Sequence, residues 1–173
     1  ITFDSVANIV LPPTTDVTAL TTAVQSLSPQ FTNYSQGSSV DKPIKLIDQE
    51  LKSMQDTFPE HFRLLYYLGD GEQTSEAARK SFKDLADTID GGAVLGYGTA
   101  TGAEINKYTN LGPSGEKIMT IDAGSNVSVP AISKLEESTL QVIAKQLGVP
   151  YVNRNDGGPV DDLVKQSNIT TVL

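Results

Sequence analysis

An apolar run that stops at an acidic turn constrains the fold of this chain most strongly. The strand expected over residues 62–68 contains an uninterrupted apolar stretch and ends in Gly69-Asp70-Gly71-Glu72. A strand of this kind needs cover on both faces, which is typical of parallel strands in α/β sheets. Ligands of open α/β sheets bind beyond the carboxyl ends of the strands. The segment therefore predicts an α/β fold in which Asp70 lies where a metal ion or a polar ligand would lie.

Composition narrows the choice of partners. The chain has 173 residues and a net charge of −8, from 13 basic and 21 acidic residues, with no basic cluster. Nucleic acid and anionic membranes are poor partners for such a surface, and no apolar run approaches the roughly 20 residues of a membrane span. Cysteine is absent, so thiol chemistry is excluded. Because the chain opens on Ile1-Thr-Phe without an initiator Met, we interpret it as a fragment or a processed product.

Strands alternate with amphipathic helices along most of the chain. Strands are expected at 1–3, 8–11, 62–68, 93–98 and 151–152, and helices after a cap at Asp16 and over 44–54, 78–89, 133–147 and 160–166. Ser133 and Glu136 form a capping box for the fourth of these helices, and Gly148 ends it. This alternation predicts βαβ units and a mostly parallel, Rossmann-like sheet flanked by helices.

Residues 103–130 have a different character. Gly, Asn, Pro and Ser separate short β-like pieces such as 117–121 and 126–129. We expect an inserted hairpin excursion on a single domain that spans residues 1–173.

The order of these pieces resembles the von Willebrand factor A (VWA) domain. Gly37-Ser38-Ser39 before a helix resembles the loop that supplies a hydroxyl to that family's metal-ion-dependent adhesion site (MIDAS), and residues 65–71 resemble the strand that bears its Thr-Asp-Gly motif. The stretch 96–105, Gly-Tyr-Gly-Thr-Ala-Thr-Gly-Ala-Glu-Ile, is similar to bacterial VWA proteins of the Bat, or aerotolerance, type. The resemblance implies a Rossmann-like sheet with a metal site at its carboxyl edge.

The chain departs from the family pattern in three places. Nothing matches the Asp-x-Ser-x-Ser motif of the family's first strand, Gly69 stands where Thr or Ser is usual, and Ser38 stands in for Thr. The resemblance thus implies an N-terminally incomplete domain. The first strand is expected to come from upstream in the parent protein, or from another chain or peptide.

The resemblance also implies the ligands of a divalent cation, with Mg²⁺ preferred and Mn²⁺ or Ca²⁺ as alternatives. Ser38 is the expected hydroxyl ligand, with Ser39 as the fallback, and Asp70 is the expected carboxylate ligand. Hard cations prefer such oxygen ligands. The alternatives are a turn role for Asp70 and a helix-cap role for Ser38. Glu72 is a minor candidate beside the ligands.

Function follows from the resemblance as an expectation. It implies a non-enzymatic protein-binding module that engages a partner's acidic side chain through the cation. It also implies a bacterial, membrane-associated protein, with the domain on the extracellular or cell-envelope face. One alternative is a VWA scaffold with a degenerate site that acts in metal-independent assembly.

A small α/β hydrolase that uses Asp70 with a Ser is the weaker alternative, because His61, the only His, has no triad partners nearby in the sequence. A dinucleotide loop at Gly96–Gly102 is disfavoured, because residues 103–113 do not have the pattern of a helix.

Overall fold

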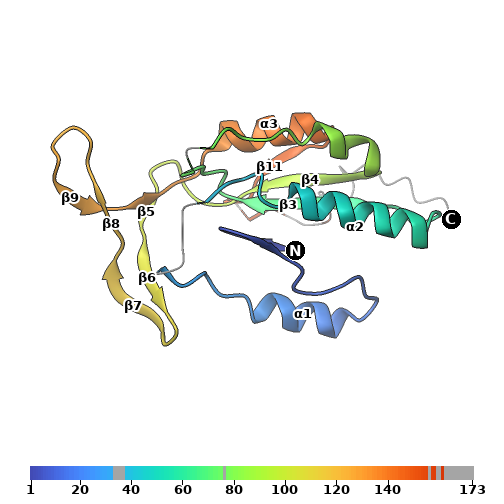
Figure 1. Cartoon of the computed structure of the whole chain (residues 1–173), viewed down its shortest axis with the longest axis horizontal. Helices are drawn as coiled ribbons and strands as arrows, with labels where there is room; N and C mark the ends of the chain where they lie inside the picture. The colour runs from blue at the N-terminus through green and yellow to red at the C-terminus, as the bar shows by residue number, and fades with distance from the viewer. Residues whose placement is uncertain (33–37, 76, 156, 159–160, 162–173) are drawn as a thin grey trace.

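A three-stranded parallel sheet forms the centre of the molecule (Figure 1). The computed structural model describes residues 1–32, 38–75, 77–155, 157–158 and 161. The strand order is β11 (Tyr151–Asn153), β4 (Gly91–Gly96) and β3 (Leu64–Gly69). Both pairings are parallel, and Leu64 to Gly69 of β3 pair in register with Gly91 to Gly96 of β4. The parallel sheet expected from the apolar runs is therefore confirmed for this part of the chain.

Three helical elements share one core with this sheet. They are α2 (Ile44–Thr57), the 3₁₀ helix η2 (Lys83–Thr88) and α3 (Glu137–Leu147), and buried side chains from each of them form one cluster with Tyr67 and Val94. On the other face of β4, Ala93 and Leu95 are buried beside Val152. β4 is thus covered on both faces, as its continuous apolar sequence requires.

The helix expected over residues 78–89 is wrong. Only η2 (Lys83–Thr88) forms there, and it is a 3₁₀ helix. The backbone N–H of Phe82 donates to the side-chain carbonyl of Gln146 on α3, at 2.9 Å. The side chain of Gln146 therefore binds a backbone N–H that a regular helix would pair with one of its own carbonyls. The side chain of Phe82 is nevertheless buried in the core, at 1% exposure.

Two of the predicted helix caps are confirmed and one is wrong. The side chain of Asp16 accepts from the backbone N–H groups of Thr18 and Ala19 at the start of α1 (Val17–Gln25). Gly148 ends α3 in the left-handed conformation, with φ 71°. The capping box does not form, because Ser133 lies in a strand and Glu136 caps α3 without a side-chain hydrogen bond.

The N-terminal segment lies beside the sheet and not in it. Strands β1 (Thr2–Phe3) and β2 (Ala7–Asn8) form a small antiparallel hairpin. The strand expected over 8–11 is therefore wrong except at Asn8. Helix α1 follows, and none of its residues is buried among the described part of the chain. Its apolar residues Leu20 and Val24 are more than half exposed.

Residues 103–133 form an arm that projects from one end of the sheet (Figure 1). It is built of three antiparallel ribbons, and its strands are β5 (Ala103–Glu104), β6 (Asn106–Thr109), β7 (Gly112–Lys117), β8 (Met119–Ile121), β9 (Ser128–Pro130) and β10 (Ile132–Ser133). β5 pairs with β10, β6 with β7, and β8 with β9. The expectation of a mostly parallel fold therefore holds for the central sheet only.

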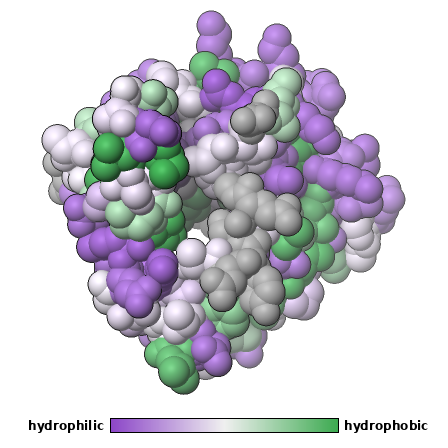
Figure 2. Space-filling model, turned by 60° about the vertical axis from the view of Figure 1, so that its left-hand side comes forward, coloured by the Kyte–Doolittle hydropathy of each residue, from purple (hydrophilic) through white to green (hydrophobic). Residues whose placement is uncertain are grey.

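The surface of the arm end mixes hydrophilic and hydrophobic residues, and it is hollowed near the middle of this view (Figure 2).

None of the described helices has both the length and the apolar character needed to cross a bilayer.

Candidate site at the carboxyl end of strand β3

Asp70 lies directly after β3, in a turn that packs against the start of α3. Its Oδ1 accepts from the backbone N–H of Glu72 at 3.0 Å, and its backbone carbonyl accepts from the N–H of Glu136 at 2.7 Å. The loop after β4 reaches the same edge, because the N–H of Tyr97 donates to the carbonyl of Gly69 at 3.0 Å. The turn is therefore held from both sides.

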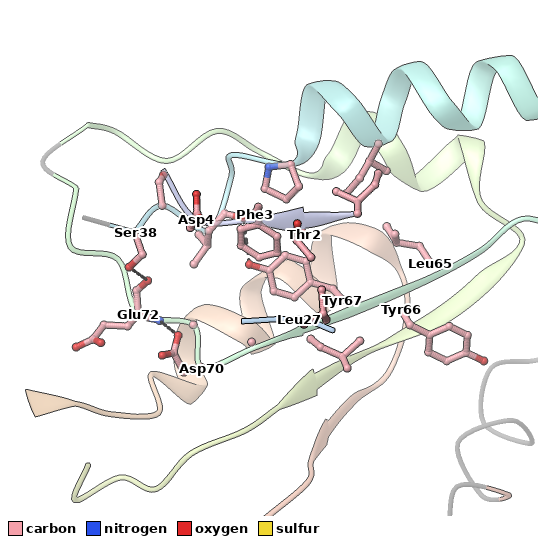
Figure 3. A pocket seen from close by; sticks show the side chains of 18 of the residues that line it. Thr2, Phe3, Asp4, Leu27, Ser38, Leu65, Tyr66, Tyr67, Asp70 and Glu72 are labelled. Carbon is pink, nitrogen blue, oxygen red and sulfur yellow. Dashed lines mark hydrogen bonds between the residues drawn. The ribbon is translucent and has the colours of Figure 1, made fainter. Parts of the chain in front are cut away.

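Ser38 lies on the loop beside this turn. Its Oγ donates to the backbone carbonyl of Glu72 at 3.3 Å, and its N–H donates to the hydroxyl of Thr74 at 2.7 Å. Its carbonyl in turn accepts from the N–H groups of Thr74 and Ser75, both at 3.1 Å. Ser38, Asp70 and Glu72 all line one cavity (Figure 3). The structure thus brings the two expected metal ligands, which lie 32 positions apart in the chain, to the same end of the sheet.

Ser39, the fallback ligand, lines the same cavity, but its hydroxyl is bonded to another carboxylate. It is 3% exposed, and its hydroxyl donates to Oδ1 of Asp41. Burial alone would raise the pKa of Asp41, but the hydrogen bonds from Ser39 and from the N–H of Lys80 outweigh it and lower the pKa. The hydroxyl of Ser39 is therefore engaged in holding this loop in place.

Ser133 and Asp4 also belong to the site, and the sequence reasoning missed both. The hydroxyl of Ser133 donates to Oδ2 of Asp70 at 3.2 Å, across 63 positions of sequence. Asp4 lines the same cavity from the turn of the β1–β2 hairpin, and Figure 3 shows it on the Ser38 side. No local pattern indicates either contact, because each depends on where a distant hairpin or ribbon lies.

The two carboxylates of the turn interact electrostatically. Burial, followed by the charge of Asp70, raises the pKa of Glu72, while the charge of Lys134 opposes the shift. Lys134 itself forms an ion pair with Glu136 at 3.0 Å. Negative charge thus accumulates at Asp70 and Glu72, and a bound cation would offset it.

The chemistry of the donors fits a hard cation that keeps several waters. Hydroxyl oxygens of Ser38 and Ser133 and carboxylate oxygens of Asp70 and Glu72 lie at one loop cluster, and Mg²⁺ commonly takes one or two carboxylates plus water. Each oxygen of Asp70 accepts a hydrogen bond, but a carboxylate offers about four lone-pair sites, so capacity remains. The described residues hold no cluster of three His, Cys, Asp or Glu side chains arranged for a metal.

Two other features of the sequence have structural roles. The ring of His61 stacks on Phe58 at 5.1 Å and 6°. The segment after Gly102 is strand β5 and not the helix that a dinucleotide loop needs, so the disfavoured nucleotide interpretation has no structural basis.

No protein-family model matches this chain, and no curated protein matches it. Two solved structures share its fold. One is an aerotolerance-related membrane protein from Bacteroides fragilis, with a TM-score of 0.65 and 21% identity over 96% of this chain and 76% of that chain. The other is the conserved hypothetical protein BatB from Bacteroides thetaiotaomicron, with a TM-score of 0.62 and 25% identity over 87% of this chain and 67% of that chain. Both similarities concern the fold and identify no site.

Proposed function

We propose that this chain is a VWA-type, non-enzymatic protein-binding module that engages its partner through a divalent cation. Ser38 and Asp70 would hold the ion, with Mg²⁺ preferred and Mn²⁺ or Ca²⁺ as alternatives. The observation that carries the proposal is the convergence of Ser38, Asp70 and Glu72 on one cavity at the carboxyl end of β3.

The bound cation would supply a Lewis-acidic coordination position for an acidic side chain of the partner. The chain itself has a net charge of −8, so an acidic partner would meet repulsion without the ion. Hydrogen bonds from Ser133 and from the N–H of Glu72 orient the carboxylate of Asp70, and the loop at 72–75 positions Ser38. These groups act by positioning ligands, and no covalent bond is made or broken.

We also propose a bacterial, membrane-associated parent protein with this domain on the extracellular or cell-envelope face. The fold shared with the aerotolerance-related membrane protein and with BatB supports this context. The inserted arm at 103–133 fits the excursion expected from the Bat-type resemblance.

A second candidate function is metal-independent assembly on the same scaffold. The observation that favours it is that both oxygens of Asp70 already accept hydrogen bonds, from Glu72 and from Ser133. The two candidates differ in whether a cation reaches Asp70.

Paramagnetic broadening by Mn²⁺ separates the two candidates. With the backbone amides assigned, substoichiometric Mn²⁺ should broaden the signals of Ser38, Asp70 and Glu72 first. Asp122 provides an internal control, because its carboxylate is exposed on the arm and accepts from Ser125. Equal broadening at Asp122 and Asp70 would indicate unspecific binding to acidic groups and would favour metal-independent assembly.

A further inference from the structure

A second cavity lies between α3 and the segment that precedes η2. Its volume is about 320 Å³. The segment at 77–82 runs along α3 (Figure 1). Nη1 of Arg79 donates to the hydroxyl of Thr139 at 2.8 Å, and the N–H of Phe82 donates to the side-chain carbonyl of Gln146 at 2.9 Å. All four of these residues line the cavity, so its two walls are tied together at two points.

The two walls have matching lengths. From Thr139 to Gln146 the axis of α3 rises by about 10 Å, at roughly 1.5 Å per residue. The three steps from Arg79 to Phe82 cover about 10 Å only when the backbone is extended. The segment therefore lies extended along the helix, and a stretch of about three extended residues would match the length of the cavity.

Two cations line this cavity. The side chains of Arg79 and Lys80 are exposed, and neither forms an ion pair with a described residue. No acidic residue is among the described residues that line the cavity. The bond to Thr139 uses one of the five guanidinium N–H groups of Arg79 and holds the side chain on α3. Less side-chain freedom is therefore lost when Arg79 binds an anion.

The charge at the cavity matches a ligand with a single negative charge. Asp41 lies behind Lys80, because its Oδ2 accepts from the backbone N–H of Lys80 at 2.7 Å. The two cations of the cavity and this carboxylate leave a net charge of +1. A carboxylate balances that charge, whereas a phosphate group carries about −1.5 to −2. The cavity therefore favours a carboxylate over a phosphate.

The rest of the cavity is apolar. Val40, Phe82 and Ile143 are buried and form part of its lining, and Val142 is 53% exposed. Since Arg79, Lys80 and Val142 are all exposed, a small ligand would remain largely in water, whereas small-molecule sites bury most of their ligand. A peptide that continues beyond the cavity could place a carboxylate on the cations and an apolar side chain on Val142.

We propose that this cavity binds an acidic peptide segment of a partner protein, in which an Asp or Glu lies next to an apolar residue. The carboxylate accepts from the guanidinium of Arg79 and from the ammonium of Lys80. The apolar neighbour covers Val142. The site needs no metal ion, which separates it from the proposed cation site at Asp70, although Val40 borders both cavities.

An amide-detected NMR titration in the presence of EDTA tests the proposal. The probe is the acetylated and amidated tripeptide Leu-Glu-Leu, which has the length of the cavity. The signals of residues 79–82 and 138–142 should shift, while the signal of Asp122 on the arm should not. The matched peptide Leu-Gln-Leu has the same size without the charge, and it should bind at least tenfold more weakly.

Three charge variants test which cations hold the carboxylate. Arg79→Gln and Lys80→Gln should each weaken binding of Leu-Glu-Leu at least threefold, the size expected for a partly exposed ion pair. Lys83→Gln is the matched control, because Lys83 is an exposed lysine on η2 that does not line the cavity. It should bind the peptide as the wild type does. All three positions are exposed, so folding should be retained.

A variant of the apolar rim tests the second half of the proposal. Val142→Ser should weaken binding of Leu-Glu-Leu and leave the weaker binding of Gly-Glu-Gly unchanged. Equal effects on the two peptides would contradict the packing of an apolar neighbour on Val142.

Several other results would overturn the proposal. They are an absence of shifts at 79–82, equal binding of the Glu and Gln peptides, and equal loss of affinity in Lys83→Gln. Acetate that binds as tightly as the peptide would identify a small-carboxylate site, and tighter binding of inorganic phosphate would refute the charge match. Binding that requires Mg²⁺ would assign the peptide to Asp70. A failure of Mn²⁺ to bind at Asp70 would leave the expected results unchanged.

Discussion

Gly71→Ala should destabilise the protein by more than its backbone conformation alone accounts for. Gly71 has φ 77°, and a Cβ built there would lie 2.6 Å from the carbonyl oxygen of Glu136 and 2.8 Å from Cγ of Leu140. The left-handed conformation costs a residue with a Cβ about 1–2 kcal/mol. The close contacts with α3 add about 1–3 kcal/mol of overpacking, so the expected loss is about 2–5 kcal/mol.

Gly148→Ala is the matched control. Gly148 has nearly the same φ, 71°, but a Cβ there meets nothing within 4 Å. Urea denaturation followed by circular dichroism, which suits a chain without Trp, gives the free energy of unfolding of both variants. The difference between them should be about 1–3 kcal/mol, the overpacking component. Equal losses would refute the reasoning that the Asp70 turn is packed directly on α3.

Two further predictions concern the core and the site. Phe82→Ala should lower the free energy of unfolding by about 3–5 kcal/mol, because Phe82 is 1% exposed. Phe62→Ala is the control, because Phe62 is 61% exposed, and it should change the free energy of unfolding by less than about 0.5 kcal/mol. Similar losses for the two variants in urea denaturation would contradict the placement of Phe82 in the core. The raised pKa of Glu72 means that the folded state holds a proton on this carboxyl more tightly than the unfolded state does. The contribution of Glu72 to the free energy of unfolding is therefore fully present below the ordinary pKa of 4.5, and it is lost as the pH rises through the raised pKa of the folded state. Glu72→Gln should flatten this part of the curve of unfolding free energy against pH, and an unchanged slope would show that the burial of Glu72 and the charge of Asp70 do not act as described.

The central sheet could be predicted because a buried parallel strand leaves a direct mark on the sequence. Residues 64–68 and 92–95 are apolar at nearly every position, and they form adjacent strands. The apolar pattern over residues 78–89 led to the wrong prediction of a helix for the same reason. Phe82 and Leu85 are buried there, but burial does not require a regular helix when a distant side chain accepts from a backbone N–H.

The candidate site was predictable only in part. The position of Asp70 at the end of β3 follows from strand chemistry, and the hydroxyl loop at Ser38 lies beside it. The contact between Ser133 and Asp70 depends on how the arm returns to the sheet, and the presence of Asp4 depends on how the N-terminal hairpin lies. Both are tertiary facts with no local signal, and Ser133 was mistaken for a helix cap on local grounds.

The completeness of the site should control how tightly it binds a metal. In residues 1–173 one hydroxyl ligand and one carboxylate ligand are proposed, so affinity should be weak. It should rise in a longer form that carries an Asp-x-Ser-x-Ser loop, because added oxygens and negative charge strengthen binding of a hard cation. Calorimetric titration of both forms with Mg²⁺ checks this, and equal affinity would contradict it.

Calorimetric titration of Mn²⁺ into the wild type, Asp70→Asn and Asp122→Asn tests the central claim most directly. Asp70→Asn keeps the size of the side chain and removes its charge, and Asp122→Asn makes the same change at an exposed carboxylate on the arm. The proposed site predicts that Asp70→Asn weakens binding at least tenfold while Asp122→Asn binds as the wild type does. Equal affinity in all three proteins would mean that Asp70 is a turn residue and that the chain does not engage its partner through a cation at this site.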